Sequence, residues 1–189
     1  MFEKVISEVE EQCREDRIPM LGPEKAKFVA KCVEEAKPSL IVECGTAIGY
    51  SGLWILRVLK EIGTGRLITV EIDAQRAKKA RASFERVGVS DIIDSRIGDA
   101  QKILKSIKEP VDFLFLDNNF DNYYPCFKAM EPQLTNPATL LADNVGIGAD
   151  SMVNYLEHVR TTYQSETHWF DIDLPWVKKD AIEVSIFQR

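Results

Sequence analysis

The sequence is poor in the residues that build zinc centres and disulfide frameworks. Among 189 residues there are only two histidines, His158 and His168. The four cysteines form no CxxC pair and follow no secretory signal, so we expect reduced thiols. These cysteines are Cys13, Cys32, Cys44 and Cys126. A zinc site is therefore not expected, nor is a secreted fold stabilised by disulfide bonds.

The chain also lacks an excess of positive charge and long apolar runs. Its formal net charge is −6, which disfavours nucleic acid or an anionic membrane as a partner. No stretch approaches the roughly 18 uninterrupted apolar residues that a membrane span requires. The first residues, MFEKVISEVEEQCRED, mix charges with short apolar spacings and do not resemble a signal peptide. We expect a cytoplasmic protein.

Helical and strand-like patterns alternate along the chain without repeats or linkers. The length suits one domain spanning residues 1–189, with 45% hydrophobic residues to fill its core. Helices are expected over residues 2–13, 23–36, 50–61, 77–87, 123–134 and 152–163. Strands are expected over residues 39–44, 66–71, 92–97, 111–116, 138–142, 167–172 and 181–187.

This alternation predicts an α/β fold with a mostly parallel sheet and helices on both faces. The two closing strands have no helix between them, which favours a terminal antiparallel hairpin and gives a seven-stranded sheet. Ligands of such sheets bind beyond the carboxyl ends of the strands. Functional residues are therefore expected just after Cys44, Glu71, Ile97, Leu116 and Ala142.

The turn after the first strand has the pattern E-x-G-x-x-x-G, formed by Glu43, Gly45 and Gly49. The glycines allow a sharp turn and a close approach of the backbone to a ligand. The pattern differs from the G-x-G-x-x-G of dinucleotide enzymes, and Glu43 suits a cationic amino-acid ligand instead. An ordinary strand-to-helix turn would also explain the glycines.

Acidic residues follow the second and third strands. Glu71, at the end of the second strand, is suited to accept hydrogen bonds from ribose hydroxyls, although it would serve NAD equally well. Asp99 is a candidate acceptor for an adenine amino group. It is an equally good candidate for the N-cap of a helix that begins at Ala100.

Two further strands end in oxygen-bearing side chains. Asp117 follows an apolar run, and Asp143 and Asn144 follow the next one. If these strands are neighbours, all three side chains meet at one rim of the sheet. Such hard donors suit Mg²⁺ or Ca²⁺ better than zinc. The sequence therefore predicts a divalent-metal site, with turns or caps as the simpler interpretation of each Asp-Asn pair.

Several segments together resemble the metal-dependent O-methyltransferases, the family of catechol O-methyltransferase. They are the residues 43–51, 67–72, 113–117, 140–145 and 156–160. The resemblance runs from about Leu21 to the C-terminus. It implies a Rossmann-like class I methyltransferase fold, with S-adenosylmethionine and Mg²⁺, or another divalent cation such as Ca²⁺ or Mn²⁺, as cofactors. The acceptor would be a catechol-like or other metal-chelating hydroxylated small molecule.

The resemblance also implies roles for individual residues. Those implied to bind S-adenosylmethionine are Leu21, Glu43, Gly45, Tyr50, Ser51, Glu71, Ile72, Asp99, Ala100 (or Gln101) and Asp117. Glu43, Tyr50 and Ser51 would hold the methionine end, near Leu21, and Glu71 would bind the ribose. Ile72 would line the adenine pocket, with Asp99 and Ala100 or Gln101 nearby. The metal ligands would be Asp117, Asp143 and Asn144.

The acceptor half departs from the family pattern. The family's general-base lysine corresponds to Phe120, which cannot accept a proton, and an aromatic that encloses catechol corresponds to Asn119. The acid that grips the second hydroxyl corresponds to Leu174, with Asp173 beside it. The catalytic base is thus unassigned: metal-induced acidity of the acceptor would make one unnecessary, and Asp121 or Lys128 are alternatives.

Three alternatives follow from these departures. A tRNA hydroxyuridine acceptor would need a basic patch such as Arg76, Lys78, Lys79 and Arg81, whose simpler interpretation is a solvated helix face. A non-catalytic S-adenosylmethionine-binding protein would explain the missing lysine. An NAD-dependent oxidoreductase is disfavoured by the glycine pattern. We also expect the helices within residues 1–37 to cover the active site or form a homodimer interface.

Overall fold

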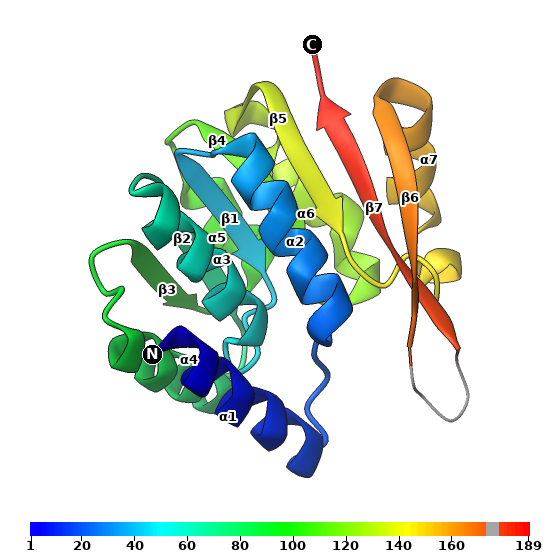
Figure 1. The fold of residues 1–189 in the computed structure, drawn as a ribbon. Coiled ribbons are helices and arrows are strands. Elements are labelled where there is room, and N and C mark those ends of the chain that lie inside the picture. The colour runs from blue at the N-terminus through cyan, green and yellow to red at the C-terminus, as the bar shows by residue number, and fades with distance from the viewer. Residues whose placement is uncertain (173–177) are drawn as a thin grey trace.

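One sheet of seven strands organises the computed structural model, which describes residues 1–172 and 178–189. The strands lie in the order β3-β2-β1-β4-β5-β7-β6 (Figure 1). Their bounds are β1 Leu40–Cys44, β2 Arg66–Glu71, β3 Ile93–Ile97, β4 Val111–Leu116, β5 Leu134–Ala142, β6 Gln164–Asp171 and β7 Lys179–Phe187.

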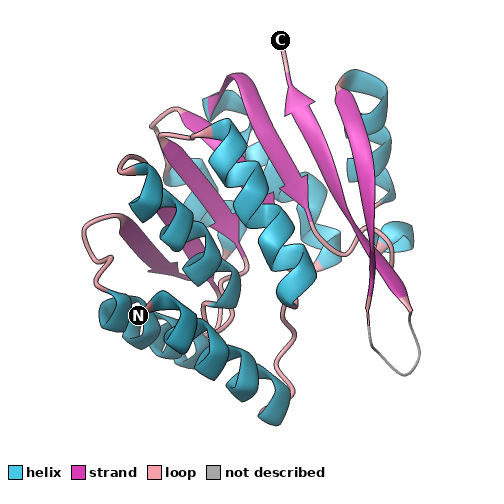
Figure 2. Cartoon of the chain, viewed as in Figure 1, coloured by secondary structure: helices cyan, strands magenta, loops and turns pink. Residues whose placement is uncertain are grey.

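Helices cover both faces of this sheet (Figure 2). One apolar core joins the sheet to α1–α4, and a second joins the opposite face to α5–α7. The bounds are α1 Phe2–Glu15, α2 Pro23–Ala36, α3 Tyr50–Ile62, α4 Ala74–Val87, α5 Ala100–Ser106, α6 Tyr123–Met130 and α7 Val153–Thr162. No helix in the described part of the chain is long and apolar enough to cross a membrane.

The topology confirms the predicted mixed sheet. Strands β1 to β5 pair in parallel, whereas β7 runs antiparallel to both β5 and β6. The chain builds outward from β1 to β3 on one side and from β4 onward on the other. The strand order therefore reverses between β1 and β4, and a ligand crevice is expected at the carboxyl ends of these two strands.

The predicted helix over residues 123–134 was too long. Helix α6 ends at Met130, and a 3₁₀ turn over Glu131–Gln133 leads directly into β5, which begins at Leu134 and not at residue 138. Pro132 has no N–H to donate to the preceding turn, so it is accommodated at the start of the 3₁₀ turn. Leu134 then pairs with Val111 of β4.

Strand β6 begins at Gln164, three residues before the predicted start, and β7 begins at Lys179, two residues before it. Strand β6 lies at one edge of the sheet, and its exposed and half-buried residues alternate. The first three residues of β6, Gln-Ser-Glu, are polar, so the apolar pattern used for the prediction does not include them. An edge strand can begin with polar residues because it needs to bury only one side.

Helix α1 is tied to α3 and α4 by ion pairs between acidic and basic side chains. Glu3 lies 2.8 Å from Arg57, Asp16 lies 3.0 Å from Lys79, and Glu8 pairs with Arg86. The apolar stripe of α1, which includes Val5, Ile6 and Val9, is buried in the core between these helices. The N-terminal helix is therefore an integral layer of the fold and not an extension.

Candidate functional site

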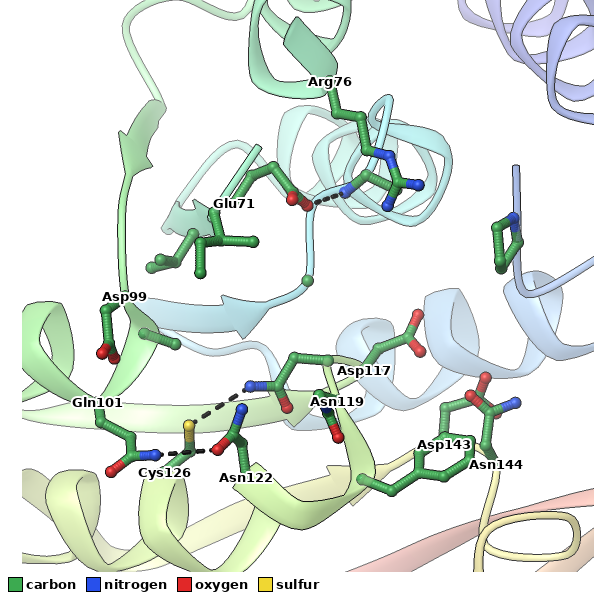
Figure 3. A pocket seen from close by; sticks show the side chains of 18 of the residues that line it. Glu71, Arg76, Asp99, Gln101, Asp117, Asn119, Asn122, Cys126, Asp143 and Asn144 are labelled. Atoms are coloured by element: carbon green, nitrogen blue, oxygen red, sulfur yellow. Dashed lines mark hydrogen bonds between the residues drawn. The ribbon is translucent and has the colours of Figure 1, made fainter. Parts of the chain in front are cut away.

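A cavity of about 670 Å³ opens at the carboxyl ends of the parallel strands (Figure 3). A smaller cavity adjoins it and is lined in part by Pro19, Met20 and Leu21. All of the site residues predicted from sequence line one of the two cavities, with the exception of Glu43. The sequence thus located the crevice, which lies where the strand order reverses.

The turn after β1 explains why the sequence carries a glycine there. Gly45 has φ +107°, and a Cβ at this position would lie 2.0 Å from the carbonyl oxygen of Asp117. The Gly45 N–H donates to Val70 of β2, and the Asp117 N–H donates to Cys44. Any side chain at residue 45 would push apart the ends of β1 and β4, which form the floor of the cavity.

Glu43 lies beneath the cavity and is fully buried. Its two carboxylate oxygens accept hydrogen bonds of 2.5 Å from the hydroxyls of Ser51 and Thr69. Burial raises the pKa of Glu43 from 4.5 to about 7, although these two hydrogen bonds favour the charged form. Glu43 therefore anchors Ser51, which does line the smaller cavity, to the end of β1.

Glu71, at the end of β2, faces the cavity while its carboxylate is held by the backbone. Its Oε2 accepts the Ala47 N–H at 2.8 Å, and its Oε1 accepts the Asp73 N–H at 2.9 Å. Each oxygen keeps a second lone pair. A pair of adjacent hydroxyls, such as those of a ribose, fits a carboxylate fixed in this way.

The region of the cavity around Ile72 and Asp99 is partly apolar. Ile72 is 76% exposed despite being apolar. Asp99 caps α5, accepting the Lys102 N–H at 3.4 Å, so the capping interpretation is confirmed. Its second oxygen is not used by this cap, and the residue lines the cavity together with Ala100.

Sequence reasoning missed Asn118 and Cys126, which also line this cavity. The Asn118 Nδ2 donates to the Cys126 Sγ at 3.5 Å, while the Asn118 Oδ1 is buried without a hydrogen-bond partner in the described residues. A buried acceptor without a donor is costly, so this atom is suited to receive a hydrogen bond from a ligand in the cavity. No local sequence signal distinguishes Asn118 from an ordinary turn residue.

Asp117, Asp143 and Asn144 gather at the opposite end of the cavity from Asp99 (Figure 3). Burial raises the pKa of Asp117 well above its ordinary value, and the nearby charge of Asp143 raises it further. Within residues 1–172 and 178–189, no three His, Cys, Asp or Glu side chains form a metal-binding group. The donor set predicted from sequence contains only two carboxylates, those of Asp117 and Asp143, and its third member is the amide oxygen of Asn144.

Lys25, on the first turn of α2, forms a buried ion cluster with this end of the cavity. Its ammonium lies 2.7 and 2.9 Å from the two oxygens of Asp143 and 2.7 Å from Oδ2 of Asp180. Burial raises the pKa of Asp143 to about 6, with Lys25 acting in the opposite direction. Lys25 and Asp180 were not predicted, because they come from segments far from Asp143 in the sequence.

Phe120, Asn119 and Ile147 also line the cavity. The ring of Phe120 lies edge-on to Tyr123, with 6.3 Å between centroids. A Cβ on Gly148 would come within 2.9 Å of this ring, so Phe120 packs against the loop after β5. The predicted roles of Asp173 and Leu174 fall outside the described residues.

Helix α1 lines the smaller cavity with one residue and contacts a second lining residue, Tyr50. Cys13 lines it, and Glu10 accepts a 2.8 Å hydrogen bond from the hydroxyl of Tyr50. Leu21, in the segment that joins α1 to α2, is buried against the same cavity. The hydroxyl of Tyr50 is thus directed to α1.

A protein-family model described as a methyltransferase domain matches residues 42–145, the segment from β1 to the loop after β5. Catechol O-methyltransferase B of Danio rerio is 32% identical over 98% of this chain and 72% of the relative's length. Catechol O-methyltransferase of Sus scrofa is 28% identical over 92% of this chain and 95% of its own length.

A solved structure has the same fold. It is the O-methyltransferase TomG from Streptomyces achromogenes, involved in tomaymycin synthesis, in complex with S-adenosylmethionine. The TM-score is 0.84, with 21% sequence identity, and the match covers 98% of this chain and 90% of the other. At this identity the similarity establishes the architecture, whereas roles of individual residues rest on the geometry above.

Proposed function

We propose that this chain is a divalent-metal-dependent enzyme. The premise is that it belongs to the S-adenosylmethionine-dependent O-methyltransferases of the catechol O-methyltransferase type. Its acceptor would be a small hydroxylated molecule that chelates the metal through two oxygens. One observation carries the proposal: oxygen donors from β4 and β5 meet at one end of a cavity whose other end carries Glu71.

The cavity suits S-adenosylmethionine along its length. Glu71 offers two fixed acceptors for the ribose hydroxyls, and Asn118 offers an unused acceptor beside the adenine region. Ser51 and Asp117, at the smaller cavity, would hold the methionine end. Burial raises the pKa of Asp117, and a cationic ligand beside it would favour its charged form.

Asp117, Asp143 and Asn144 fit a divalent cation. Their donor atoms are two carboxylates and one amide, the hard oxygens that Mg²⁺, Ca²⁺ and Mn²⁺ prefer. Lys25 compensates only part of the negative charge that Asp117, Asp143 and Asp180 bring together. A bound cation would lower the pKa of an acceptor hydroxyl, as metals do for bound water.

The departures at the acceptor end favour a substrate that needs no protein base. Phe120 excludes water and offers an apolar wall, whereas Asn119 offers an amide for hydrogen bonding. A catechol, or an enol with an adjacent oxygen, is acidic enough when chelated to lose its proton to solvent. Asp121 and Lys128 are the alternative bases; Asp121 lies in the 3₁₀ turn that begins at Phe120.

A tRNA hydroxyuridine acceptor is the second candidate, and the surface charges argue against it. Within the basic patch considered from sequence, Lys79 pairs with Asp16 at the end of α1, and Arg81 donates to the hydroxyl of Ser95. The basic face considered from sequence is therefore partly neutralised within the protein itself. Binding that weakens steeply with salt would identify a tRNA substrate.

The test is methyl transfer from labelled S-adenosylmethionine to a panel of catechols, flavonoids and bulk tRNA, with Mg²⁺ and with EDTA. We expect transfer to chelating small molecules in Mg²⁺, and a loss of at least about 100-fold in EDTA or after Asp143→Ala, since the cation positions and activates the acceptor. Activity that survives both would contradict the metal mechanism.

Cofactor binding without turnover of any acceptor would instead support a non-catalytic S-adenosylmethionine-binding protein. Binding of NADH, followed by its fluorescence, would support an oxidoreductase, and none is expected. A further control is Asp99→Asn, which changes the cap of α5 at the other end of the cavity and should leave the Mg²⁺ requirement intact.

A further inference from the structure

Asp180, at the start of β7, has a carboxylate whose oxygens are completely engaged. Its Oδ1 accepts the backbone N–H groups of Gly146 and Ile147 at 3.2 and 3.1 Å. Its Oδ2 accepts Lys25 at 2.7 Å and the Nδ2 of Asn144 at 2.9 Å. A carboxylate has about four acceptor sites, so Asp180 has no lone pair left for a cation. It is suited to hold neighbouring groups and not to be a metal ligand.

One of these hydrogen bonds decides which end of the Asn144 amide faces the cavity. Because the Nδ2 donates to Asp180, the Oδ1 is directed away from it, and no described residue donates a hydrogen bond to that oxygen. Asn144 has φ +58°, a left-handed conformation that asparagine tolerates. The backbone turn and the Asp180 contact together fix the side chain.

The loop that carries Asn144 is also fixed to β7. The Val145 N–H donates to Ala181 at 3.0 Å, and a Cβ on Gly146 would lie 2.9 Å from the Cα of Asp180. The loop that carries Asn144 is thus packed directly against the start of β7. Lys25, bound to the Asp180 carboxylate, holds both oxygens of Asp143.

We propose that Asp180 is a positioning residue that turns the Oδ1 of Asn144 toward a divalent cation and, through Lys25, holds Asp143 beside it. This inference rests on the proposed metal dependence. It assigns to β7 a part in the metal site, although β7 contributes no ligand. Partners of this kind, which orient metal ligands, typically change metal affinity by about 10- to 100-fold when they are replaced.

The test measures Mn²⁺ affinity by the electron paramagnetic resonance signal of the free ion, in the wild type and in two variants. Asp180→Asn has nearly the same shape but presents an amide, which can turn the Asn144 amide around. Asp180→Glu keeps the charge but moves the carboxylate one methylene farther along. We expect both to bind Mn²⁺ at least about 10-fold more weakly, while S-adenosylmethionine binding in EDTA changes less than about three-fold.

The two variants separate positioning from charge. If Asp180→Glu bound Mn²⁺ like the wild type while Asp180→Asn did not, Asp180 would contribute only its charge and the inference would be wrong. Wild-type affinity in both variants would also overturn it. If one variant fails to fold, as judged by loss of S-adenosylmethionine binding, the other decides. A wild type whose Mn²⁺ affinity is absent or unchanged by Asp117→Asn would instead refute the proposed metal site itself.

Discussion

The two ends of the cavity hold their acidic side chains in different ways. At the β1–β2 end, Glu43 and Glu71 are bound by neutral groups, namely hydroxyls and backbone N–H donors. At the β4–β5 end, Asp143 is bound by the ammonium of Lys25, which it shares with Asp180. Neutral donors fix the position of a carboxylate without compensating its negative charge. The ammonium of an ion cluster fixes the position and also compensates the charge.

This difference corresponds to what each end is proposed to bind. Ribose hydroxyls are neutral and need carboxylates that are fixed in place. A cation needs several negative groups close together, and such a group is unstable without a counter-charge. Lys25 provides that counter-charge for Asp143 and Asp180 before any ligand arrives. The comparison therefore predicts that replacing the charged partner of a buried carboxylate lowers the free energy of unfolding more than replacing a neutral partner does.

The largest effect is expected for Lys25→Met. Lys25 is 4% exposed, and its loss would leave Asp143 and Asp180 buried without a positive partner. Breaking a buried pair on one side typically costs about 3–5 kcal/mol. We expect a loss of this size in the free energy of unfolding, measured by urea denaturation in EDTA.

Lys27→Met is the matched control, two residues along the same helix. Lys27 pairs with Glu24 at the surface, where ion pairs contribute less than about 1 kcal/mol. Equal stability of Lys25→Met and Lys27→Met would mean that the cluster around Asp143 does not stabilise the fold, and the comparison of the two ends would fail.

The next effect concerns Glu43 and depends on pH. Because burial raises its pKa from 4.5 to about 7, the folded state holds a proton between these values that the unfolded state has lost. Stability must then fall as pH rises from 4.5 to about 7, by up to about 3 kcal/mol. Glu43→Gln stays neutral throughout, so its stability relative to the wild type should rise over this window.

The measurement is the free energy of unfolding of both proteins at several pH values between 4 and 8. Glu61→Gln, at an exposed position on α3, controls for the substitution itself. A constant difference between Glu43→Gln and the wild type across the window would show that Ser51 and Thr69 offset the burial of Glu43 completely.

Phe120→Lys tests the acceptor end and is expected to have a smaller effect. A lysine at this position would supply a general base next to the proposed metal site. We expect turnover of simple catechols to rise by about 10-fold, measured with labelled S-adenosylmethionine in Mg²⁺. Phe120→Met is the control for the loss of the ring. Unchanged or lower rates would show that the pocket is shaped for another acceptor.

The fold was predictable because its signals are local. The bounds of α2 and β4 agree with the sequence prediction, since Pro23 marks the helix start and every residue of Val111–Leu116 except Asp112 is apolar. The prediction failed at the boundary between α6 and β5, where the local sequence pattern is compatible with both a helix and a strand. The apolar residues after Tyr123 suit a helix as well as a strand, and only packing of Leu134 against β4 decides between them.

The site was predictable where one strand end supplies a side chain, as for Glu71 and Asp143. It was not predictable where the geometry depends on partners distant in sequence. Asp180 meets Lys25 across 155 positions and Asn144 across 36. Neither contact has a spacing rule, because α2 and β7 are brought together only by the completed sheet. Knowledge of strand order is needed before such partners can be proposed.

The smallest effect is expected for Tyr50→Phe, which sharpens the comparison at the smaller cavity. The hydroxyl of Tyr50 donates to Glu10 of α1 at 2.8 Å, while Glu10 keeps a second partner in Arg14. Its removal should therefore cost about 1 kcal/mol of stability, and the Kd for S-adenosylmethionine, measured by calorimetry, should change less than about three-fold. Glu10→Gln should weaken the same contact and reproduce both results. An increase of about 10-fold in Kd for Tyr50→Phe alone would mean that the hydroxyl leaves α1 and binds the cofactor, so that α1 opens when the cavity is filled.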